Sequence, residues 1–346
     1  MKCRVCRGPA VIDIRRHNAN FCREHFLRLC RDQVEKAIGR FGMLQPGERV
    51  LVAVSGGKDS LALWDILVDL GYAADGFYLG LGIGDYSDES AGYARRYAQS
   101  RNLTLHTVDL PATHGFDIPG GARAAKRAPC SACGLSKRHL FDDAARRGGY
   151  DALATGHNLD DEAAVLMGNT LRWQTEYLGR QLPVLEARDG FPRKVKPLVR
   201  LSERETAAYC ILRGIDYVVE ECPMAVGNKH LAYKAALNDI EVQSPGAKHD
   251  FYFGFLERAS ERFRAQVERD RGDLAPCERC GSPTDAGVCA FCRLTARATA
   301  PKAERKGAAH LEAREKPSEA VARAALRPQR TRAGMTPVRI SDRRLR

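Results

Sequence analysis

The pattern of apolar and polar positions in the middle of the chain predicts strands separated by helices. Runs of strand type cover residues 49–54, 76–81, 103–108 and 151–155. Apolar residues at helical spacing occupy the segments 60–70, 88–101, 135–147 and 160–171. Strands buried on both faces and joined by helices are typical of a parallel sheet. The expected fold class is therefore α/β, a doubly wound parallel sheet with its ligand site at the carboxyl ends of the strands.

Length and composition favour a soluble globular protein with one large core and small appendages. The chain has 346 residues, of which 44% are hydrophobic, and no segment reaches the roughly 18 to 20 apolar residues that span a bilayer. The start of the chain, Met1-Lys2-Cys3, has no apolar signal region. We therefore expect a cytoplasmic protein that does not associate with membranes.

The net charge of +12 is concentrated near the C-terminus, where residues 301–346 contain 13 Lys and Arg against 5 Asp and Glu. A basic balance suits a polyanionic partner, because Lys and Arg bind phosphate groups by releasing condensed counterions. Few apolar residues and no aromatic ones occur in this segment. We expect residues 298–346 to form a basic, disordered tail.

Eight of the twelve cysteines fall into close pairs, which favours metal binding over disulfides in a protein without an export signal. The N-terminal set is Cys3, Cys6, Cys22 and His25. The C-terminal set is Cys277, Cys280, Cys289 and Cys292. Each set offers four ligands in two pairs, as a tetrahedral structural zinc requires. The expected domains are a zinc finger over 1–30, a catalytic domain over 31–265, a zinc ribbon over 270–297 and the tail.

A glycine-rich loop, Ser55-Gly56-Gly57-Lys58-Asp59-Ser60, lies where the first predicted strand is followed by a helix. Its backbone N–H groups and the helix N-terminus can bind phosphate oxygens, and Lys58 adds a positive charge. The glycines allow a ligand to approach the backbone closely. The loop is not a Walker A motif, because the Gly-x4-Gly-Lys-Ser/Thr spacing is absent and Asp59 follows the lysine. The pattern predicts a nucleotide phosphate site.

A second polar motif, Thr155-Gly156-His157-Asn158-Leu159-Asp160-Asp161-Glu162, follows the fourth predicted strand. The adjacent carboxylates of Asp160 and Asp161 could hold Mg²⁺ on pyrophosphate or orient a substrate. Taken alone, such a pair more often forms the acidic first turn of an ordinary helix. Its occurrence together with the glycine-rich loop favours a role in the site.

A third group consists of Cys130 and Cys133 on one turn and the distant Cys222. Three thiolates are one fewer than a structural zinc needs, whereas an iron–sulfur cubane on three cysteines leaves one iron free for a ligand such as sulfide. Persulfide chemistry on Cys130 or Cys222 is the alternative, and a zinc completed by a histidine is a third possibility. Cys30 and Cys210 lie in helical patterns, so we expect them to be buried packing residues.

The loop at 55–60 resembles the PP-loop of the ATP pyrophosphatases, which split ATP into AMP and pyrophosphate while adenylating a carbonyl oxygen. The motif at 155–162 is similar to the second signature of that family. The three central cysteines narrow the resemblance to the tRNA 2-thiolation enzymes of the TtcA and TtuA families. The terminal zinc modules resemble the TtuA type, the tRNA-5-methyluridine 2-sulfurtransferases, and their archaeal and eukaryotic relatives acting on wobble uridine. The resemblance covers about residues 1 to 295, and the tail departs from it.

The resemblance implies two Zn²⁺ on the terminal sets and a [4Fe-4S] cluster on Cys130, Cys133 and Cys222. It also implies ATP with Mg²⁺, and ATP contacts at Ala53, Ser55, Gly56, Gly57, Lys58, Asp59, Ser60, Leu79, Lys137, Gly156 and Asp161. It assigns catalytic roles to Lys137, Asp161, Cys130, Cys222 and Asp59. The partners it implies are tRNA, a ubiquitin-like thiocarboxylated sulfur-carrier protein and a second copy of the chain in a homodimer.

The expected activity is ATP-dependent 2-thiolation of tRNA, in which the C2 oxygen of a uridine is adenylated and then replaced by sulfur. A 5-methyluridine in the T-loop is favoured as the target, and wobble uridine is the alternative. A PP-loop ligase or amidotransferase, such as a lysidine-forming synthetase, is disfavoured because amine chemistry has no use for three cysteines. An RNA-binding zinc protein with a non-catalytic nucleotide fold would bind RNA without releasing pyrophosphate.

Overall fold

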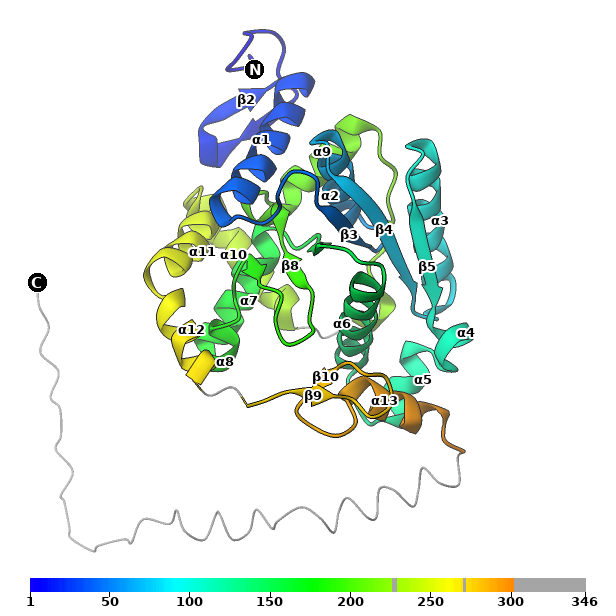
Figure 1. Cartoon of the computed structure of the whole chain (residues 1–346). Coiled ribbons are helices and arrows are strands. Elements are labelled where there is room, and N and C mark those ends of the chain that lie inside the picture. Colours follow the sequence, from blue (N-terminus) through cyan, green and yellow to red (C-terminus); the bar gives the residue numbers. More distant parts are fainter. Residues whose placement is uncertain (226–228, 270–271, 302–346) are drawn as a thin grey trace, which may run out of the picture. The chain divides into compact units, whose positions relative to one another are not determined.

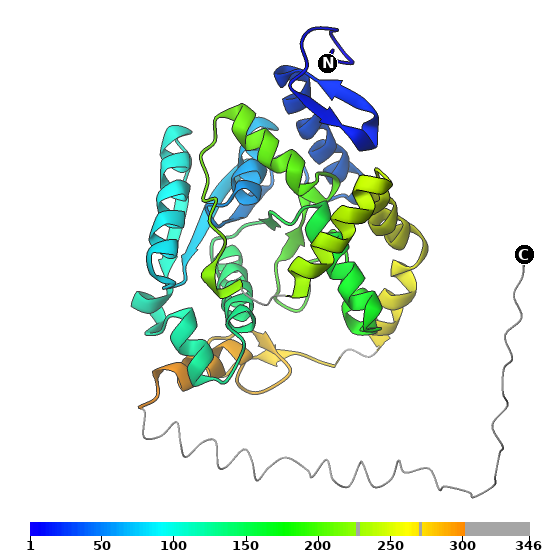
Figure 2. The ribbon, with the colours of Figure 1, turned by 180° about the vertical axis from the view of Figure 1, so that it is seen from behind.

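The computed structural model describes residues 1–225, 229–269 and 272–301. Residues Met1–Thr299 form one compact unit, shown from two sides in Figures 1 and 2, and Ala300 begins a second. Of the predicted tail, residues 298–346, the part from 302 onward lies outside the described residues, and the four domain boundaries stay predictions. No helix within the described ranges is long and apolar enough to cross a membrane.

The centre of the first unit is a six-stranded sheet with the strand order β5-β4-β3-β6-β8-β7. All neighbouring pairs are parallel except β7 with β8, which is antiparallel. The strands are β3 (Arg49–Val54), β4 (Ala73–Gly80), β5 (Leu105–Asp109), β6 (Ala152–Thr155), β7 (Val184–Leu185) and β8 (Arg193–Val195). The expected doubly wound α/β sheet is confirmed, with an antiparallel strand added at one edge.

Helices cover both faces of the sheet, because successive side chains of a strand point to opposite sides. Val50, Val52 and Val54 of β3 pack with buried residues of α2, α3 and two further helices, α1 (Arg23–Phe41) and α9 (Glu203–Arg213). Leu51 packs on the other face with buried residues of α6 and of α5 (Ile118–Ala124) and α13 (Ala290–Thr299). The helices predicted between the strands are confirmed, and each begins before the first residue that the pattern gave. They are α2 (Lys58–Asp69), α3 (Gly84–Ser100), α6 (Pro129–Arg147) and α7 (Leu159–Leu171).

The second half of the chain adds helices that the sequence pattern did not predict. They are α8 (Thr175–Leu178), the 3-10 helix η2 (Pro197–Arg200), α9 (Glu203–Arg213), η3 (Pro223–Ala225), α10 (Lys229–Gln243), α11 (Ala247–Arg258) and α12 (Ser260–Arg269). Between β5 and α6 lie two short helices, α4 (Leu110–His114) and α5 (Ile118–Ala124). Helices α10 and α11 pack on α7, the helix that follows the second polar motif.

The N-terminal cysteine set lies on a small module whose strands β1 (Ile12–Ile14) and β2 (Ala19–Phe21) form an antiparallel hairpin joined by η1 (Arg15–His17). The long helix α1 (Arg23–Phe41) follows and packs against α9 and η2. Cys30 is fully buried in α1 and Cys210 in α9, so both are packing residues as predicted.

The C-terminal cysteine set lies on β9 (Ala275–Pro276), β10 (Pro283–Thr284) and α13 (Ala290–Thr299). Helix α13 packs against α5 and α6. Its Phe291 is buried and stacks on His139 of α6, with ring centroids 4.2 Å apart. This module therefore rests directly on the helix that carries Cys130 and Cys133 (Figure 1).

A buried carboxylate ties α2 to its neighbours. Asp65 is 1% exposed and accepts hydrogen bonds from the hydroxyls of Tyr97 in α3 and Tyr209 in α9, at 2.9 and 2.6 Å. Arg213 donates from Nε at 2.8 Å and completes the set. Burial and the Asp65 charge raise the pKa of both tyrosines, so the hydroxyls remain donors. The arrangement fixes the helix that begins at the glycine-rich loop.

Candidate functional site

The glycine-rich loop joins β3 to α2 at the carboxyl end of the sheet. Gly57 is the N-cap of α2 and has extended backbone angles, so the first N–H groups of the helix are left for a ligand. The hydroxyl of Ser60 accepts from the backbone N–H of Ser55 at 3.1 Å and donates to the carbonyl of Gly57 at 2.9 Å. Ser55 itself is exposed. The loop thus has the fixed, open backbone that a phosphate group needs.

Gly56 is a position that requires glycine. Its φ is +75°, and a Cβ built there would lie 2.2 Å from the carbonyl oxygen of Ser90. We expect Gly56→Ala to lower stability by about 1–2 kcal/mol from the backbone conformation alone and more from the clash. Since the loop must move, the rise in melting temperature on adding ATP should shrink as well.

The matched control is Gly57→Ala, because Gly57 has a negative φ and its added Cβ would meet only the Ser55 hydroxyl at 3.5 Å. Thermal unfolding of both variants with and without ATP measures the difference. If Gly56→Ala proved as stable as Gly57→Ala, the positive φ and the close contact with Ser90 described for Gly56 would be incorrect.

The ends of three strands meet beside this loop. Ala53 of β3 lies in register with Phe77 of β4 on one side and with Thr155 of β6 on the other. Leu79 follows two residues later on β4 and is buried. Gly156 follows β6, and a Cβ there would lie 3.0 Å from the backbone between Asp59 and Ser60. The predicted adenosine-binding positions are therefore next to the phosphate loop, although their contacts with ATP stay predictions.

A network of charged side chains links the two polar motifs. Lys58 Nζ contacts Asp59 Oδ2 at 3.1 Å and Glu203 Oε1 at 2.8 Å. The other oxygen of Glu203 contacts Lys234 at 3.1 Å, and Lys234 also pairs with Asp161 at 2.7 Å. Two lysines from α2 and α10 are thus held side by side by one carboxylate from α9.

The sequence analysis missed Glu203 and Lys234. The capping box at the start of α9, in which Ser202 and Glu205 exchange hydrogen bonds, is a local signal that could have placed Glu203 in a helical first turn. Nothing local indicates that Glu203 lies beside Lys58, which is 145 residues away in the chain. Lys234 lies in an α10 pattern without a clear apolar stripe.

The network shifts the titration of its members. Burial alone would raise the pKa of Glu203, but hydrogen bonds and charges from Lys58 and Lys234 lower it to about 2. Burial acts to lower the pKa of Lys58 and of Lys234. The nearby carboxylates, Asp59 and Glu203 for Lys58 and Asp161 and Glu203 for Lys234, outweigh this effect and raise both pKa values. All three groups therefore remain charged at neutral pH, and two cations stay available for an anionic ligand.

This gives a pH-dependent prediction for Glu203→Gln. The folded-state pKa of Glu203 is lowered from its ordinary value of 4.5 to about 2. Its contribution to stability is therefore full above about pH 4.5 and is lost as the pH falls towards 2. The variant should be less stable than the parent at neutral pH, and the difference should shrink below pH 4.5 and vanish only at about pH 2.

Melting temperatures recorded between pH 2 and 7 test the Glu203 prediction. Glu257→Gln is the control, because Glu257 forms an exposed ion pair with Arg40 that should contribute little at any pH. A pH-independent deficit in Glu203→Gln would argue against the ionised network.

The three acids of the second motif have different environments. Asp161 forms a capping box with Asn158 and reaches the lysine network. Asp160 is buried and accepts from Lys248 Nζ and from the backbone N–H of Glu203, so it anchors α9 and α11. Glu162 is also buried, and its partners are Lys196, Gln181 and Tyr252. Of the three, Asp161 is the one whose carboxylate joins the lysine network, and its catalytic and ATP-binding roles stay predictions.

The other catalytic acid predicted from the sequence, Asp59, lies on the first turn of α2. Its Oδ1 accepts from Asn158 Nδ2 at 3.0 Å and from the hydroxyl of Thr206. Asp59 and Asp161 are close enough to influence each other electrostatically. Two carboxylates so placed beside a phosphate loop form a donor set that fits Mg²⁺.

The three central cysteines gather at the start of α6. Cys130 and Cys133 lie on its first two turns, and Cys222 directly precedes η3, which contacts α6. The Cys130 sulfur lies 3.4 Å from the carbonyl oxygen of Met224. Burial raises the pKa of Cys133, and the nearby charges of Cys222 and Cys130 raise it further. The three cysteines therefore lie on neighbouring elements, and a three-thiolate donor set suits an iron–sulfur cluster with one open iron.

Lys137 lies one turn after Cys133 on the same helix, and its charge acts to lower the pKa of that thiol. No hydrogen bond or ion pair joins Lys137 to Asp161 within the part of the chain that the structure describes. The structure therefore associates Lys137 with the cysteines and Asp161 with the lysine network. The pairing of the two in catalysis stays a prediction.

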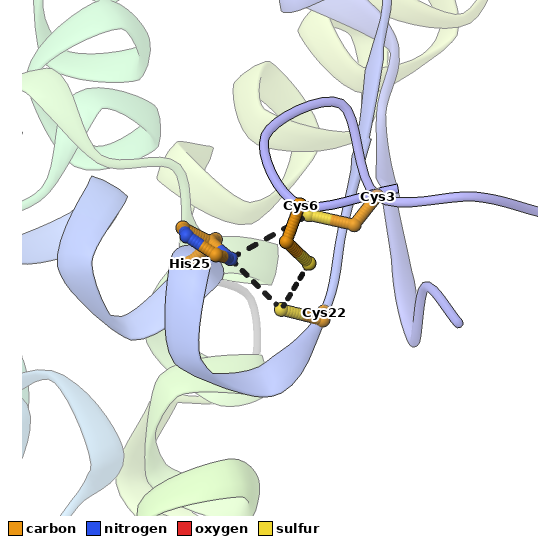
Figure 3. Close-up of side chains that lie close together, drawn as sticks. All are labelled: Cys3, Cys6, Cys22 and His25. Atoms are coloured by element: carbon orange, nitrogen blue, oxygen red, sulfur yellow. Dashed lines mark hydrogen bonds between the residues drawn. The ribbon is translucent and has the colours of Figure 1, made fainter. Parts of the chain in front are cut away.

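Within each terminal set, the fold brings the four ligand residues together. Figure 3 shows Cys3, Cys6, Cys22 and His25 pointing toward one another, with His25 Nδ1 at 3.1 Å from the Cys22 sulfur. The ligand atoms of this set lie within 4.8 Å of one another, as do those of Cys277, Cys280, Cys289 and Cys292. Four soft or borderline ligands at this spacing suit one tetrahedral metal ion per set, and zinc is the metal we predicted.

A parallel sheet whose first strand ends in this phosphate loop defines a PP-loop α/β protein, the class expected from the sequence. Residues 2–27 match the sequence family described as 2-thiouridine synthetase TtuA, N-terminal LIM domain. A relative from Thermus thermophilus, tRNA-5-methyluridine(54) 2-sulfurtransferase, is 52% identical over 294 residues, which are 85% of this chain and 91% of the relative. A relative of the same name from Pyrococcus horikoshii is 40% identical, over 85% and 93% of the two chains.

The chain belongs to the family of tRNA-5-methyluridine(54) 2-sulfurtransferases, and it is a sulfurtransferase enzyme. Among solved structures, U34-tRNA thiolase NcsA from Methanococcus maripaludis with its [4Fe-4S] cluster matches with a TM-score of 0.70. That match covers 85% of this chain and 95% of NcsA at 24% identity. It confirms the fold.

Proposed function

We propose that this enzyme uses ATP to replace the C2 oxygen of a 5-methyluridine in the T-loop of tRNA with sulfur. The observation that carries the proposal is the 52% identity to a tRNA-5-methyluridine(54) 2-sulfurtransferase along nine-tenths of that protein. Wobble uridine is not favoured as the target. Relatives named cytoplasmic tRNA 2-thiolation protein 1 reach 30% identity, whereas three named for 5-methyluridine(54) lie between 40% and 52%.

The first step is activation of the base by ATP. The loop from Ser55 to Ser60 binds the phosphates with its backbone N–H groups, and Lys58 and Lys234 stabilise the negative charge that develops when pyrophosphate leaves. The C2 oxygen attacks the α-phosphorus, so the base becomes adenylated and the oxygen becomes a good leaving group. Asp59 and Asp161 are the residues that would hold Mg²⁺ on the departing pyrophosphate.

The second step is delivery of sulfur at the cysteine group. Cys130, Cys133 and Cys222 would hold a [4Fe-4S] cluster, which when bound supplies an iron without a cysteine ligand where sulfide can be carried. Lys137 lies one turn from Cys133 and places a positive charge beside the incoming sulfur and the adenylate. Sulfur attacks C2, the C2–O bond breaks, and AMP leaves with the original oxygen.

The partners we propose follow the same assignment. The target uridine must leave its stack to reach the site, so the enzyme needs extensive contact with tRNA. The sulfur donor is proposed to be a ubiquitin-like protein with a thiocarboxylate end, and the working form a homodimer. Pull-down with the carrier protein and light scattering of the purified enzyme test these two points separately.

The central experiment is nucleoside mass spectrometry of tRNA treated with anaerobically purified enzyme, ATP, Mg²⁺ and sulfide. We expect 2-thio-5-methyluridine to form, with AMP released in proportion. Controls omit ATP or use a tRNA with cytidine at position 54. Formation of a 2-thio nucleoside at the wobble position instead would reassign the substrate, and its absence at both positions would refute the proposal.

A further inference from the structure

Trp173 has a backbone conformation that is unusual for a bulky residue. Its φ is +49°, and among the described residues other than glycine with positive φ it is the one aromatic. It lies just after α7, where its N–H bonds to the Thr170 carbonyl and the N–H of Gln174 bonds to the Asn169 carbonyl. These bonds form the Schellman motif that ends many helices, and glycine is the usual residue at this position.

Packing does not explain why a tryptophan stands there. The Trp173 side chain is 72% exposed, so it contributes little apolar burial to offset the strained backbone. Leu171 and Tyr177 beside it are 62% and 56% exposed. We name Leu171, Arg172, Trp173 and Tyr177 the Trp173 corner. Strain that is held without a structural benefit points to a role in binding.

The Trp173 corner is connected to the candidate active site through α7 and α10. The ring of Tyr233 in α10 lies over Gly168, where an added Cβ would approach it to 2.7 Å. The next residue of α10, Lys234, pairs with Asp161 at the start of α7. The ten residue steps along α7 from Asp161 to Leu171 span about 15 Å.

Three cationic side chains, Arg172, Lys229 and Lys234, lie along this path, together with the acids Asp161 and Glu176. Burial lowers the pKa of His230, and the charges of Arg172 and Lys234 lower it further, so His230 lies within electrostatic reach of both ends of the path. Arg172 and Lys229 are exposed. An exposed aromatic residue at the end of a basic path is the arrangement by which proteins bind single-stranded nucleic acid, with bases stacked on rings.

We propose that the Trp173 corner binds an unstacked part of the substrate tRNA, with one base stacked on Trp173 while the target uridine occupies the site near Asp161. The separation of about 15 Å means that the stacked base is a neighbour of the modified nucleotide and not the nucleotide itself. This inference rests on the proposed function, because it requires tRNA as the substrate.

The chain offers a direct spectroscopic test, because it contains only two tryptophans. Trp64 is fully buried, and its Nε1 donates to the Ala74 carbonyl at 2.9 Å, whereas Trp173 is exposed. Acrylamide should therefore quench Trp173 selectively. Addition of substrate tRNA should quench the Trp173 emission and protect it from acrylamide, and Trp173→Phe should abolish this response.

A second test separates binding from folding. Trp173→Gly should raise the melting temperature by about 2–4 °C, because glycine relieves the left-handed conformation. The same variant, and Trp173→Ala, should weaken tRNA binding by roughly 5- to 150-fold, the range measured for loss of one stacked base. Ile211→Ala is the matched control, since Ile211 is 69% exposed on α9 and should not affect binding.

The outcomes are distinguishable from failure of the proposed function. If the parent enzyme thiolates tRNA but saturating tRNA leaves Trp173 emission and acrylamide access unchanged, the stacking inference is wrong while the function stands. Unchanged tRNA affinity in Trp173→Gly also overturns the stacking inference. This outcome includes the case in which a protein partner, and not tRNA, covers the Trp173 corner. If the parent enzyme thiolates no tRNA, the proposed function itself fails.

Discussion

Replacing Cys130 with alanine should abolish 2-thio nucleoside formation while leaving ATP binding intact. The expected loss is roughly 10³-fold or more, because groups that act as a unit fail together when one is removed. Cys130 lies at the exposed start of α6 with its sulfur near the Met224 carbonyl, and neither group contacts the phosphate loop. Removing its sulfur should therefore disturb the cysteine group without moving Lys58 or Ser60.

The Cys130 experiment needs three readouts on anaerobically prepared protein. Nucleoside mass spectrometry reports thiolation, the ATP-induced rise in melting temperature reports the nucleotide site, and iron analysis reports the cysteine group. Cys30→Ala is the control, because Cys30 is buried in α1 outside the site and should keep thiolation. Normal thiolation by Cys130→Ala would remove the cysteines from the mechanism and favour a non-cluster route.

Asp65→Ala should destabilise the protein by about 2–5 kcal/mol, because each buried donor left without an acceptor costs about 1–3 kcal/mol. The change deprives the hydroxyls of Tyr97 and Tyr209 of their acceptor, while Arg213 keeps its ion pair with Asp69. Since α2 is held to α3 and α9 by these bonds, the variant should also respond less to ATP.

Asp69→Ala, one turn further along α2, is the comparison for Asp65. Asp69 is about a third exposed and pairs with Arg101 and Arg213 near solvent, so its loss should reduce stability by about 1 kcal/mol or less. Thermal unfolding of the two variants under identical metal loading gives the difference. Equal destabilisation would mean that burial of the Asp65 carboxylate does not matter.

The elements that the sequence predicted are those whose burial is visible in a local pattern. β3 and β6 are apolar because both faces are covered, and the predicted helices between the strands carry helical periodicity. β7 has two residues, and β8, Arg193-Lys194-Val195, reads as polar because its lysine and arginine pair with Asp142 and Glu48. Such ion pairs are formed across 52 and 145 residues of chain and leave no periodic signal.

The candidate site likewise contains residues that local motifs predict and residues that only the fold brings together. The phosphate loop, the helix start at Asp161 and the cysteine sets are contiguous motifs, so their positions could be predicted from spacing. Glu203 and Lys234 belong to the site only because α9 and α10 fold over it, and an isolated glutamate or lysine on a helix surface is ordinary. The different environments of Asp160 and Asp161 likewise depend on Lys248 from α11.

Because Phe291 stacks on His139, the stability of the C-terminal cysteine module is coupled to that of α6, the helix that carries Cys130 and Cys133. His139 lies two residues after Lys137 and six after Cys133, so whatever holds this helix in place also preorganises those side chains. Any free energy by which a metal in the module steadies α6 must reappear in the affinity of the cysteine group for its own ligand, and the reverse holds equally. We therefore expect metal binding at the C-terminal set and ligand binding at the cysteine group to be reciprocally linked.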